Sequence, residues 1–277
     1  MFNISQQELQ VLTGYIYEIC GVHLDSSKEY LVKTRLDNLV KSNGCASYSE
    51  LYYKARSDRT GKINTDIINA ITTPETLFFR DKNPFEVLQS KLINEILEKK
   101  SSTVLPGHLR IWSAASSTGQ EIYSIAITLL ETITNINKYK ISLTATDISN
   151  VVLDIAKSGR YNKFEISRGL TQQQMDKYFI EEDQYWQIKE DIRKMVRFQK
   201  INLMQPLIGM GTFDIVFCRN VAIYFTLEDR KKLFDRIANV IVPDGYLFIG
   251  SSEFLTGICD RFKAMRHGKA IYYQKIK

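Results

Sequence analysis

The stretch from Leu109 to Ala126, LRIWSAASSTGQEIYSIA, decides the fold because a loop of very small residues joins a short apolar run to an amphipathic segment. The run around Ile111 is typical of a buried strand, and the segment after the loop is typical of a helix. An open α/β sheet forms nucleotide-type sites at such turns, at the carboxyl ends of its strands. The helix is indicated by apolar residues at helical spacing: Ile122, Ile125, Ala126 and Leu129.

The loop from Ser113 to Gly119 suits one kind of ligand better than others. It holds a single glycine, so it is a poor phosphate cradle. S-adenosylmethionine (SAM) has an adenosine but no phosphate, and it needs close approach of the backbone. An ordinary connection between a strand and a helix would show the same pattern, so the loop alone leaves both interpretations open.

Composition sets the broad class of the protein. With 277 residues, 44% of them hydrophobic and 25% charged, the chain is long enough for one large and one smaller globular domain. Residues 1–10 carry no positive charge ahead of an apolar stretch, and no apolar run is long enough to cross a bilayer. We therefore expect a cytoplasmic protein with no direct membrane insertion.

The cysteines, the histidines and the net charge indicate which kinds of site and partner to expect. The four cysteines form no CxxC pair, and the three histidines are scattered, so neither a disulfide nor a metal site is predicted. The net charge of +6 and the pI near 9.0 favour an acidic partner, although solubility alone would explain them.

Residues 1–68 are predicted to form a basic helical domain. Ser26 and Glu29 have the spacing of a capping box that would open its second helix. Residues 28–62 hold eight Lys or Arg and four Asp or Glu, an excess of four positive charges. Such a face is either simply solvated or a docking surface for something acidic. The candidate docking residues are Lys28, Lys33, Arg35 and Lys41.

The next stretch, residues 71–80, reads ITTPETLFFR and interrupts the helical pattern. In one interpretation it is a linker, with Phe78 and Phe79 in the core and Arg80 on the surface. In the other, the Arg80 guanidinium lies against aromatic side chains and binds a carboxylate in fork geometry.

Two acidic residues are candidates for contacts to a cofactor. Residues 141–147 form a second predicted strand that ends in Asp147, where a ribose diol would be hydrogen-bonded. Glu121 lies early in the helix after the small-residue loop, where a negative charge also stabilises the helix without any ligand.

The remaining strands follow at intervals. Short β-prone runs within residues 174–193 predict a small antiparallel insertion, which either covers a sheet edge or grips a peptide. Residues 213–218 predict a central parallel strand, with Arg219 and Asn220 facing the ligand crevice and Tyr224 within reach of it. Further elements are a strand from residue 195, a helix over 227–242, a strand over 246–250 after the turn Pro243-Asp244-Gly245, and an antiparallel pair within 262–273.

An ordered set of motifs covers nearly the whole chain: ETLFFRD, WSAASSTGQEIYSIA, ATDIS, GRY, NL, FDIVFCRNVAIYF and PDGYLFIGSSE. This set resembles the chemotaxis receptor methyltransferases, the CheR family. The resemblance implies a small all-α N-terminal domain, residues 1–68, followed by an α/β domain, residues 69–277. That α/β domain would be a class I SAM-dependent methyltransferase (Rossmann-like) domain with an inserted small antiparallel β-subdomain. It also implies transfer of a methyl group from SAM to glutamate side chains of chemoreceptor cytoplasmic helices, which leaves S-adenosylhomocysteine (SAH).

The resemblance also implies roles for single residues. Arg80 and Tyr224 would orient the reaction, and Arg80 would also contact the cofactor. Glu121 and Asp147 would lie near the methionine amine and the ribose. Three positions depart from the family pattern: Pro74 replaces an asparagine that contacts the cofactor, and Gln120 and Ile122 replace a glutamate and a proline. The remaining residues that match cofactor-contacting positions are Thr76, Asn202, Leu203, Arg219 and Asn220.

Two other functions compete with this one. A methyltransferase acting on nucleic-acid bases usually carries an Asn/Asp-Pro-Pro-aromatic run where this chain has CRNVAIYF, so no nucleic-acid partner is expected. A non-catalytic SAM-binding module of the same family stays open because of Pro74. The expected partners are acidic receptor helices, together with a receptor tail peptide if the β-insertion grips one.

Overall fold

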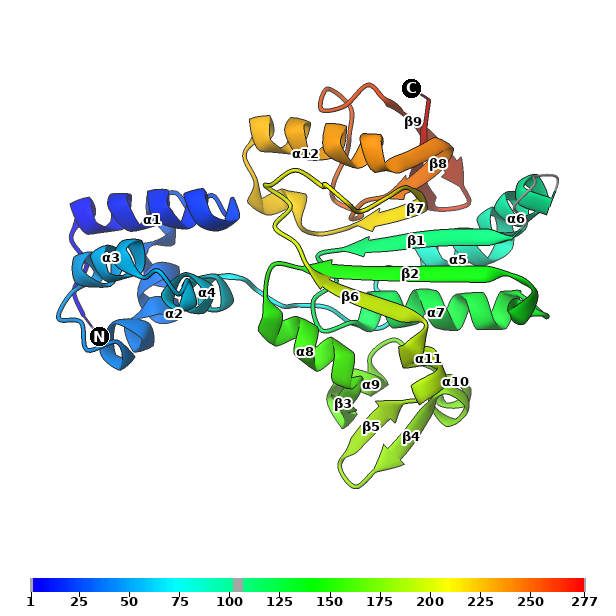
Figure 1. Ribbon diagram of the computed structural model, residues 1–277, viewed down its shortest axis with the longest axis horizontal. Helices are drawn as coiled ribbons and strands as arrows, with labels where there is room; N and C mark the ends of the chain where they lie inside the picture. Colours follow the sequence, from blue (N-terminus) through cyan, green and yellow to red (C-terminus); the bar gives the residue numbers. More distant parts are fainter. Residues whose placement is uncertain (1, 102–106, 277) are drawn as a thin grey trace. The chain divides into compact units, whose positions relative to one another are not determined.

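The structure is a computed structural model that describes residues 2–101 and 107–276. It divides into two compact units (Figure 1). The helical unit comprises Met1–Pro74 and Tyr224–Asp229, and the sheet unit comprises Glu75–Ile223 and Arg230–Lys277. None of the helices in the described ranges is long and apolar enough to cross a membrane.

The helical unit is held together by apolar side chains from all four of its helices, including Leu12, Leu36 and Leu51, which are almost completely buried. Gly21 ends the first helix with φ of 75°, a conformation that glycine adopts without strain. The predicted capping box at Ser26 is wrong, because Asp25 accepts a hydrogen bond from the Ser27 N–H and caps a 3₁₀ turn instead. The helices are α1 (Gln6–Cys20), α2 (Glu29–Ser42), α3 (Tyr48–Ser57) and α4 (Lys62–Ile71).

The segment 224–229 joins the helical unit although it lies far along the chain. The Tyr17 hydroxyl donates to Asp229 Oδ2 at 2.5 Å, and the His23 N–H donates to the Tyr224 carbonyl at 2.9 Å. The backbone of Tyr224 is therefore fixed against the end of α1.

The sheet unit is built on a mostly parallel sheet, as predicted. Seven strands of the described ranges pair in the order β6-β2-β1-β7-β8-β10-β9. The first five are parallel, and β10 is antiparallel to both of its neighbours. The strands are β1 (His108–Ala114), β2 (Lys140–Asp147), β6 (Val196–Lys200), β7 (Phe213–Cys218), β8 (Ile241–Phe248), β9 (Phe262–His267) and β10 (Ala270–Lys275).

One predicted turn is part of a strand. The sequence predicts that Pro243-Asp244-Gly245 separates a helix from a strand, but β8 already begins at Ile241. Phe213 pairs with Ile241 and Ile215 pairs with Tyr246, so the intervening residues bulge out of the ladder.

Helices cover both faces of the sheet. The chain runs from β1 to β2 and β6 on one side of β1, and from β7 to β8 on the other, so right-handed crossovers place α12 on the face opposite α7 and α8 (Figure 1). A continuous core on the α7 side includes Ile111, Leu143 and Phe217. The helices are α5 (Asn83–Val87), a π-helical turn (Leu88–Leu92), α6 (Ile93–Ser101), α7 (Gln120–Thr132), α8 (Asn150–Ser158) and α12 (Leu227–Val240).

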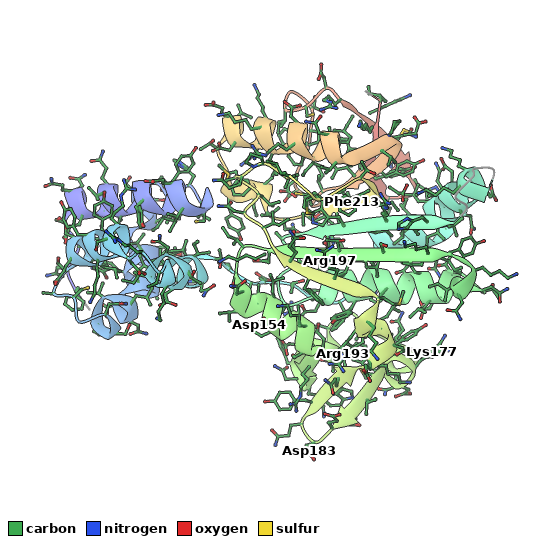
Figure 2. The ribbon with its side chains drawn as sticks, in the orientation of Figure 1. Asp154, Lys177, Asp183, Arg193, Arg197 and Phe213 are labelled. Atoms are coloured by element: carbon green, nitrogen blue, oxygen red, sulfur yellow. The ribbon has the colours of Figure 1, made fainter. Side chains whose placement is uncertain are left out.

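A small antiparallel sheet follows α8, in the order β3-β5-β4. Its hairpin confirms the predicted insertion, and Asp183 marks the tip (Figure 2). The third strand, β3, was not predicted, because its three residues are too few to show a pattern. The elements are β3 (Arg160–Asn162), α9 (Lys163–Ser167), α10 (Gln172–Tyr178), β4 (Phe179–Glu182), β5 (Tyr185–Ile188) and α11 (Glu190–Lys194).

Candidate cofactor site

Three neighbouring strands end at the same level. Ala114 of β1 pairs with Thr146 of β2 on one side and with Cys218 of β7 on the other. The residues that follow, among them Asp147 and Arg219, therefore lie at the same edge of the sheet, on either side of the end of β1. The strand order reverses between β1 and β7, and such a switch point opens a ligand crevice in α/β sheets.

Arg219 is the centre of a buried ionic network at this switch point. Its Nη1 donates to Glu121 Oε2 at 2.9 Å, and its Nη2 donates to Asp81 Oδ2 at 2.7 Å and to the Arg80 carbonyl at 2.9 Å. Ser113 holds the other oxygen of Glu121 through a hydrogen bond of 2.8 Å. Both carboxylate oxygens of Glu121 are therefore held by other side chains. Glu121 thus does more than place a negative charge near the start of α7.

The loop that carries Thr76 and Arg80 has an unusual backbone. Phe79, Asp81 and Lys82 have positive φ values of 50°, 64° and 39°, which are costly for residues other than glycine. The Phe79 N–H donates to Ser124 Oγ of α7 at 2.9 Å, and this bond anchors the loop to the large core.

The side chains of that loop agree with the linker interpretation for the two phenylalanines, whereas carboxylate binding by Arg80 stays a prediction. Phe78 is fully buried and Phe79 packs on Phe85, as the linker interpretation expected. Arg80 is half-buried, and its Nη1 donates to the Glu75 carbonyl at 3.1 Å. Thr76, four residues earlier in the same loop, is also half-buried.

Asp147 holds the turn after β1. Its Oδ2 accepts from the Ser117 N–H at 2.9 Å, and its Oδ1 accepts from the Ser149 N–H at 3.0 Å. Burial raises the pKa of the Asp147 carboxyl above its ordinary value of 3.8, and the backbone N–H groups act in the opposite direction. A ligand that donates hydrogen bonds to this carboxylate would favour its charged form.

The end of β6 brings a further predicted segment to the same edge. Asp147 pairs with Lys200, so Asn202 and Leu203 follow directly beyond β6. Asn202 Oδ1 accepts from the Met204 N–H at 2.9 Å, and the Leu203 carbonyl accepts from Arg236 Nη2 at 2.7 Å.

Asn220 is fixed by a residue that the sequence did not single out. Asn220 has φ of 56°, and its N–H donates to Glu253 Oε2 at 2.9 Å. The Gly250 N–H donates to the same oxygen, and a Cβ at Gly250 would lie 2.6 Å from it. The motif GSSE could have pointed to Glu253, because an acid directly after a strand that ends at the ligand edge is a candidate.

The remaining predicted residues lie in the helical unit. Tyr224 is 40% exposed, and the structure groups it with α1 rather than with Arg80. On α2, Lys33 lies 3.9 Å from Glu29, Lys41 lies 2.8 Å from Asp37, and Arg35 donates to the carbonyls of Ala70 and Thr72. These three side chains have partners within their own unit.

The crevice fits an adenosine cofactor that lacks phosphates. Ser116 Oγ and Ser117 Oγ are buried and have no hydrogen-bond partner within the described residues, so the loop holds polar atoms that a ligand could satisfy. Acidic side chains at the strand ends suit ribose hydroxyls and an ammonium group. Residues 2–101 and 107–276 contain no group of three His, Cys, Asp or Glu that could bind a metal ion.

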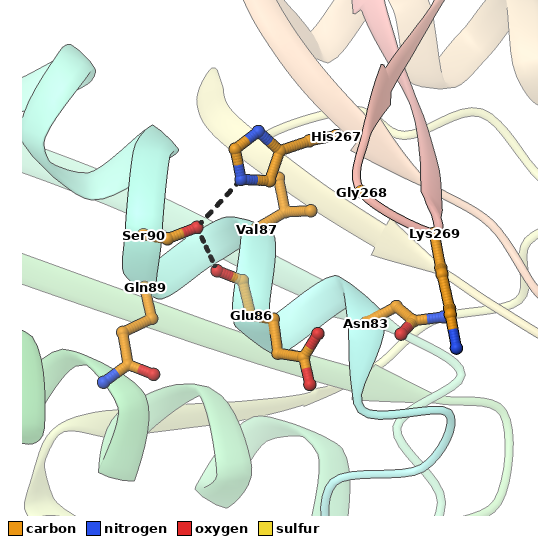
Figure 3. A pocket seen from close by; sticks show the side chains of 8 residues that line it. All are labelled: Asn83, Glu86, Val87, Gln89, Ser90, His267, Gly268 and Lys269. Carbon is orange, nitrogen blue, oxygen red and sulfur yellow. Dashed lines mark hydrogen bonds between the residues drawn. The ribbon is translucent and has the colours of Figure 1, made fainter.

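A separate pocket of about 340 Å³ lies between α5, the π-helical turn and the β9–β10 turn (Figure 3). Ser90 Oγ lies 3.3 Å from His267 Nε2 in this pocket. Its lining includes none of the predicted site residues, so we place the cofactor site at the strand ends. The lining residues are Asn83, Glu86, Val87, Gln89, Ser90, His267, Gly268 and Lys269.

Comparisons with known proteins show the family to which the chain belongs. Residues 74–271 match the family model for the CheR methyltransferase SAM-binding domain, and residues 7–72 match that for the CheR methyltransferase all-alpha domain. The chain is 39% identical to the chemotaxis protein methyltransferase of Vibrio parahaemolyticus, over 98% of both chains. It is 36% identical to chemotaxis protein methyltransferase 1 of Pseudomonas aeruginosa, again over 98% of both. The chain therefore belongs to the CheR family of SAM-dependent chemotaxis protein methyltransferases.

Proposed function

We propose that this protein transfers the methyl group of SAM to glutamate side-chain carboxylates of chemoreceptors and forms glutamate methyl esters. The observation that carries the proposal is the network in which Arg219 joins Glu121 to the loop of Arg80, at the edge that also holds Asp147. This network would fix the cofactor's amino-acid end beside Glu121 and its ribose beside Asp147.

The residues present suit a reaction that needs no general base. A glutamate side chain has an ordinary pKa of about 4.3, so it is already a nucleophilic anion at neutral pH. When bound, SAM supplies an electrophilic methyl group on a positively charged sulfur. The protein has to align the two and exclude water from the pair of opposite charges.

Arg80 and Tyr224 are the proposed positioning groups for the substrate carboxylate. Since Arg80 Nη1 already contacts the Glu75 carbonyl, a substrate carboxylate would either share this guanidinium or displace the carbonyl. The exposed Tyr224 side chain sits on a backbone fixed by His23, so it can contact a substrate without reordering its own loop.

The basic surface formed by α2 and by Lys28, which ends the 3₁₀ turn directly before this helix, is proposed to bind acidic receptor helices. Since Arg35 and Lys41 also stabilise their own unit, Lys28 and Lys33 are the better positions at which to test docking.

The small sheet is a second proposed contact, for a receptor tail peptide. Strand β4 is an edge strand, and Ile180 on it is 50% exposed. An extended peptide could pair with that edge and cover Ile180.

Calorimetric titration with SAM and with SAH tests the cofactor site. The wild-type protein is expected to bind both ligands, and Asp147→Ala is expected to lose most of this affinity, because the ribose hydroxyls lose their acceptor. Absence of binding to the wild-type protein would contradict the proposed cofactor site. Binding without methyl transfer to any receptor fragment would favour the non-catalytic SAM-binding module.

A further inference from the structure

Asp81 contacts the centre of the cofactor site although no motif assigned it a role. It shares the Arg219 guanidinium with Glu121, at 2.7 Å and 2.9 Å, so the two carboxylates lie beside each other. The Arg219 side chain is 1% exposed, whereas that of Asp81 is 32% exposed. Asp81 is therefore the partly solvated member of a network whose cation is buried.

The network carries an unbalanced charge. One guanidinium faces two carboxylates, which leaves one negative charge, and the carbonyl of Arg80 adds a further partial negative charge at Nη2. The Arg80 side chain is a second cation on the same loop, but it donates to the Glu75 carbonyl rather than to either carboxylate. The charge of Asp81 is thus incompletely neutralised by its contact with Arg219.

SAM and SAH differ in charge at the sulfur, so a negative charge on Asp81 would affect the affinity for each of them differently. Both have the same adenosine and the same amino-acid end, so contacts to those ends act on both ligands. SAM alone carries a methyl group and a positive charge on sulfur. A negative charge near the sulfur therefore favours SAM over SAH, whereas a shape change in the pocket affects both.

We propose that Asp81 is a specificity-determining residue that strengthens binding of cationic SAM relative to SAH. This inference rests on the proposed placement of the cofactor's amino-acid end beside Glu121. A unit charge within about 10 Å of the sulfur, at the edge of a partly buried site, changes the relative affinity by about ten-fold. Because it favours SAM over SAH, Asp81 would also help fresh SAM to replace the product SAH.

The chain offers matched variants for the test. In Asp81→Asn the amide oxygen can still accept from Arg219, and asparagine tolerates the φ of 64° at this position, so the shape is kept while the charge is lost. Asp81→Glu keeps the charge and alters the geometry. Asp154→Asn removes a charge from the exposed side of α8, where Asp154 pairs with Lys157 (Figure 2), and controls for net charge.

Calorimetry with SAM and with SAH would be performed on the full chain for all four proteins. We expect Asp81→Asn to raise the dissociation constant for SAM about ten-fold more than that for SAH. Asp81→Glu should keep the wild-type ratio of the two constants even if both rise, and Asp154→Asn should match wild type.

Equal weakening of both ligands in Asp81→Asn would overturn this proposal and leave the cofactor placement standing. Failure of the wild-type protein to bind either ligand would overturn the cofactor placement and this proposal together.

Discussion

Asp147 combines burial with a proposed role that needs its charged form. Because its folded-state pKa is raised above the ordinary value of 3.8, the protonated carboxyl favours the native state at low pH. That contribution is lost as the pH rises through the folded-state pKa. Ribose hydroxyls that donate to the carboxylate would lower this pKa again.

SAM binding is therefore expected to release protons at pH values near the raised pKa of Asp147, and to tighten as the pH rises through that range. Calorimetry in buffers of different ionisation enthalpy measures the release. Asp147→Asn should abolish it, and an unchanged release in that variant would show that another group titrates.

Gly169 packs directly against the backbone of the loop that carries Arg80. It has φ of 101°, and a Cβ at this position would lie 1.8 Å from the Phe78 carbonyl oxygen. We expect Gly169→Ala to lower the free energy of unfolding by about 3 kcal/mol or more, because backbone must move. SAM affinity should fall with it.

Gly257→Ala is the matched control, since Gly257 has φ of 73° but no atom within 4 Å of a Cβ. It should cost only about 1 kcal/mol, the strain of the left-handed backbone. Chemical denaturation of both variants measures the difference, and equal losses would show that the contact with Phe78 does not constrain the loop.

At the candidate site, the sequence singles out residues but does not predict their contacts. Asp147 and Glu121 were found from their places after a strand and at a helix start. The role of Arg219 was not predictable, because its partners Asp81 and Glu121 lie 138 and 98 residues away. Only the folded strand order brings these three side chains together.

At the scale of elements, strongly patterned segments were predicted and weakly patterned ones were missed. The continuous apolar run of β7 and the small-residue turn between β1 and α7 predict their structure directly. The strand β3 depends on pairing with β5, which supplies what its own three residues cannot. The bulge in β8 likewise depends on its register with β7.

Helix α2 allows a test of receptor docking. Reversing two charges in Lys28→Glu with Lys33→Glu is expected to raise KM for a receptor cytoplasmic fragment several-fold and to reduce its dependence on salt, because the attraction is electrostatic. SAM affinity should stay at the wild-type value, and an unchanged KM would contradict docking on this face.

A charge reversal elsewhere on the helical unit serves as the control. Lys62 lies on α4 and pairs with Asp66 at 2.7 Å, so Lys62→Glu makes the same change in charge away from α2 as Lys33→Glu alone makes on it. Lys62→Glu should leave KM much closer to the wild-type value than Lys33→Glu does.

At the scale of the whole molecule, the proposed function assigns separate tasks to the two units. In that proposal the sheet unit binds the cofactor through Asp147, Glu121 and Arg219, and the helical unit presents the basic face of α2. The helical unit also fixes the backbone of Tyr224 through the His23 N–H. Since Tyr224 lies between two segments of the sheet unit in the sequence, sequence order alone could not assign it to the helical unit.

Incubation with methyl-labelled SAM and a chemoreceptor cytoplasmic fragment tests the central claim most directly. We predict label on glutamate side chains that alkaline hydrolysis releases as methanol, as methyl esters require, and no label with Asp147→Ala. Label that resists alkaline hydrolysis, or no transfer by a protein that binds SAM, would contradict the account.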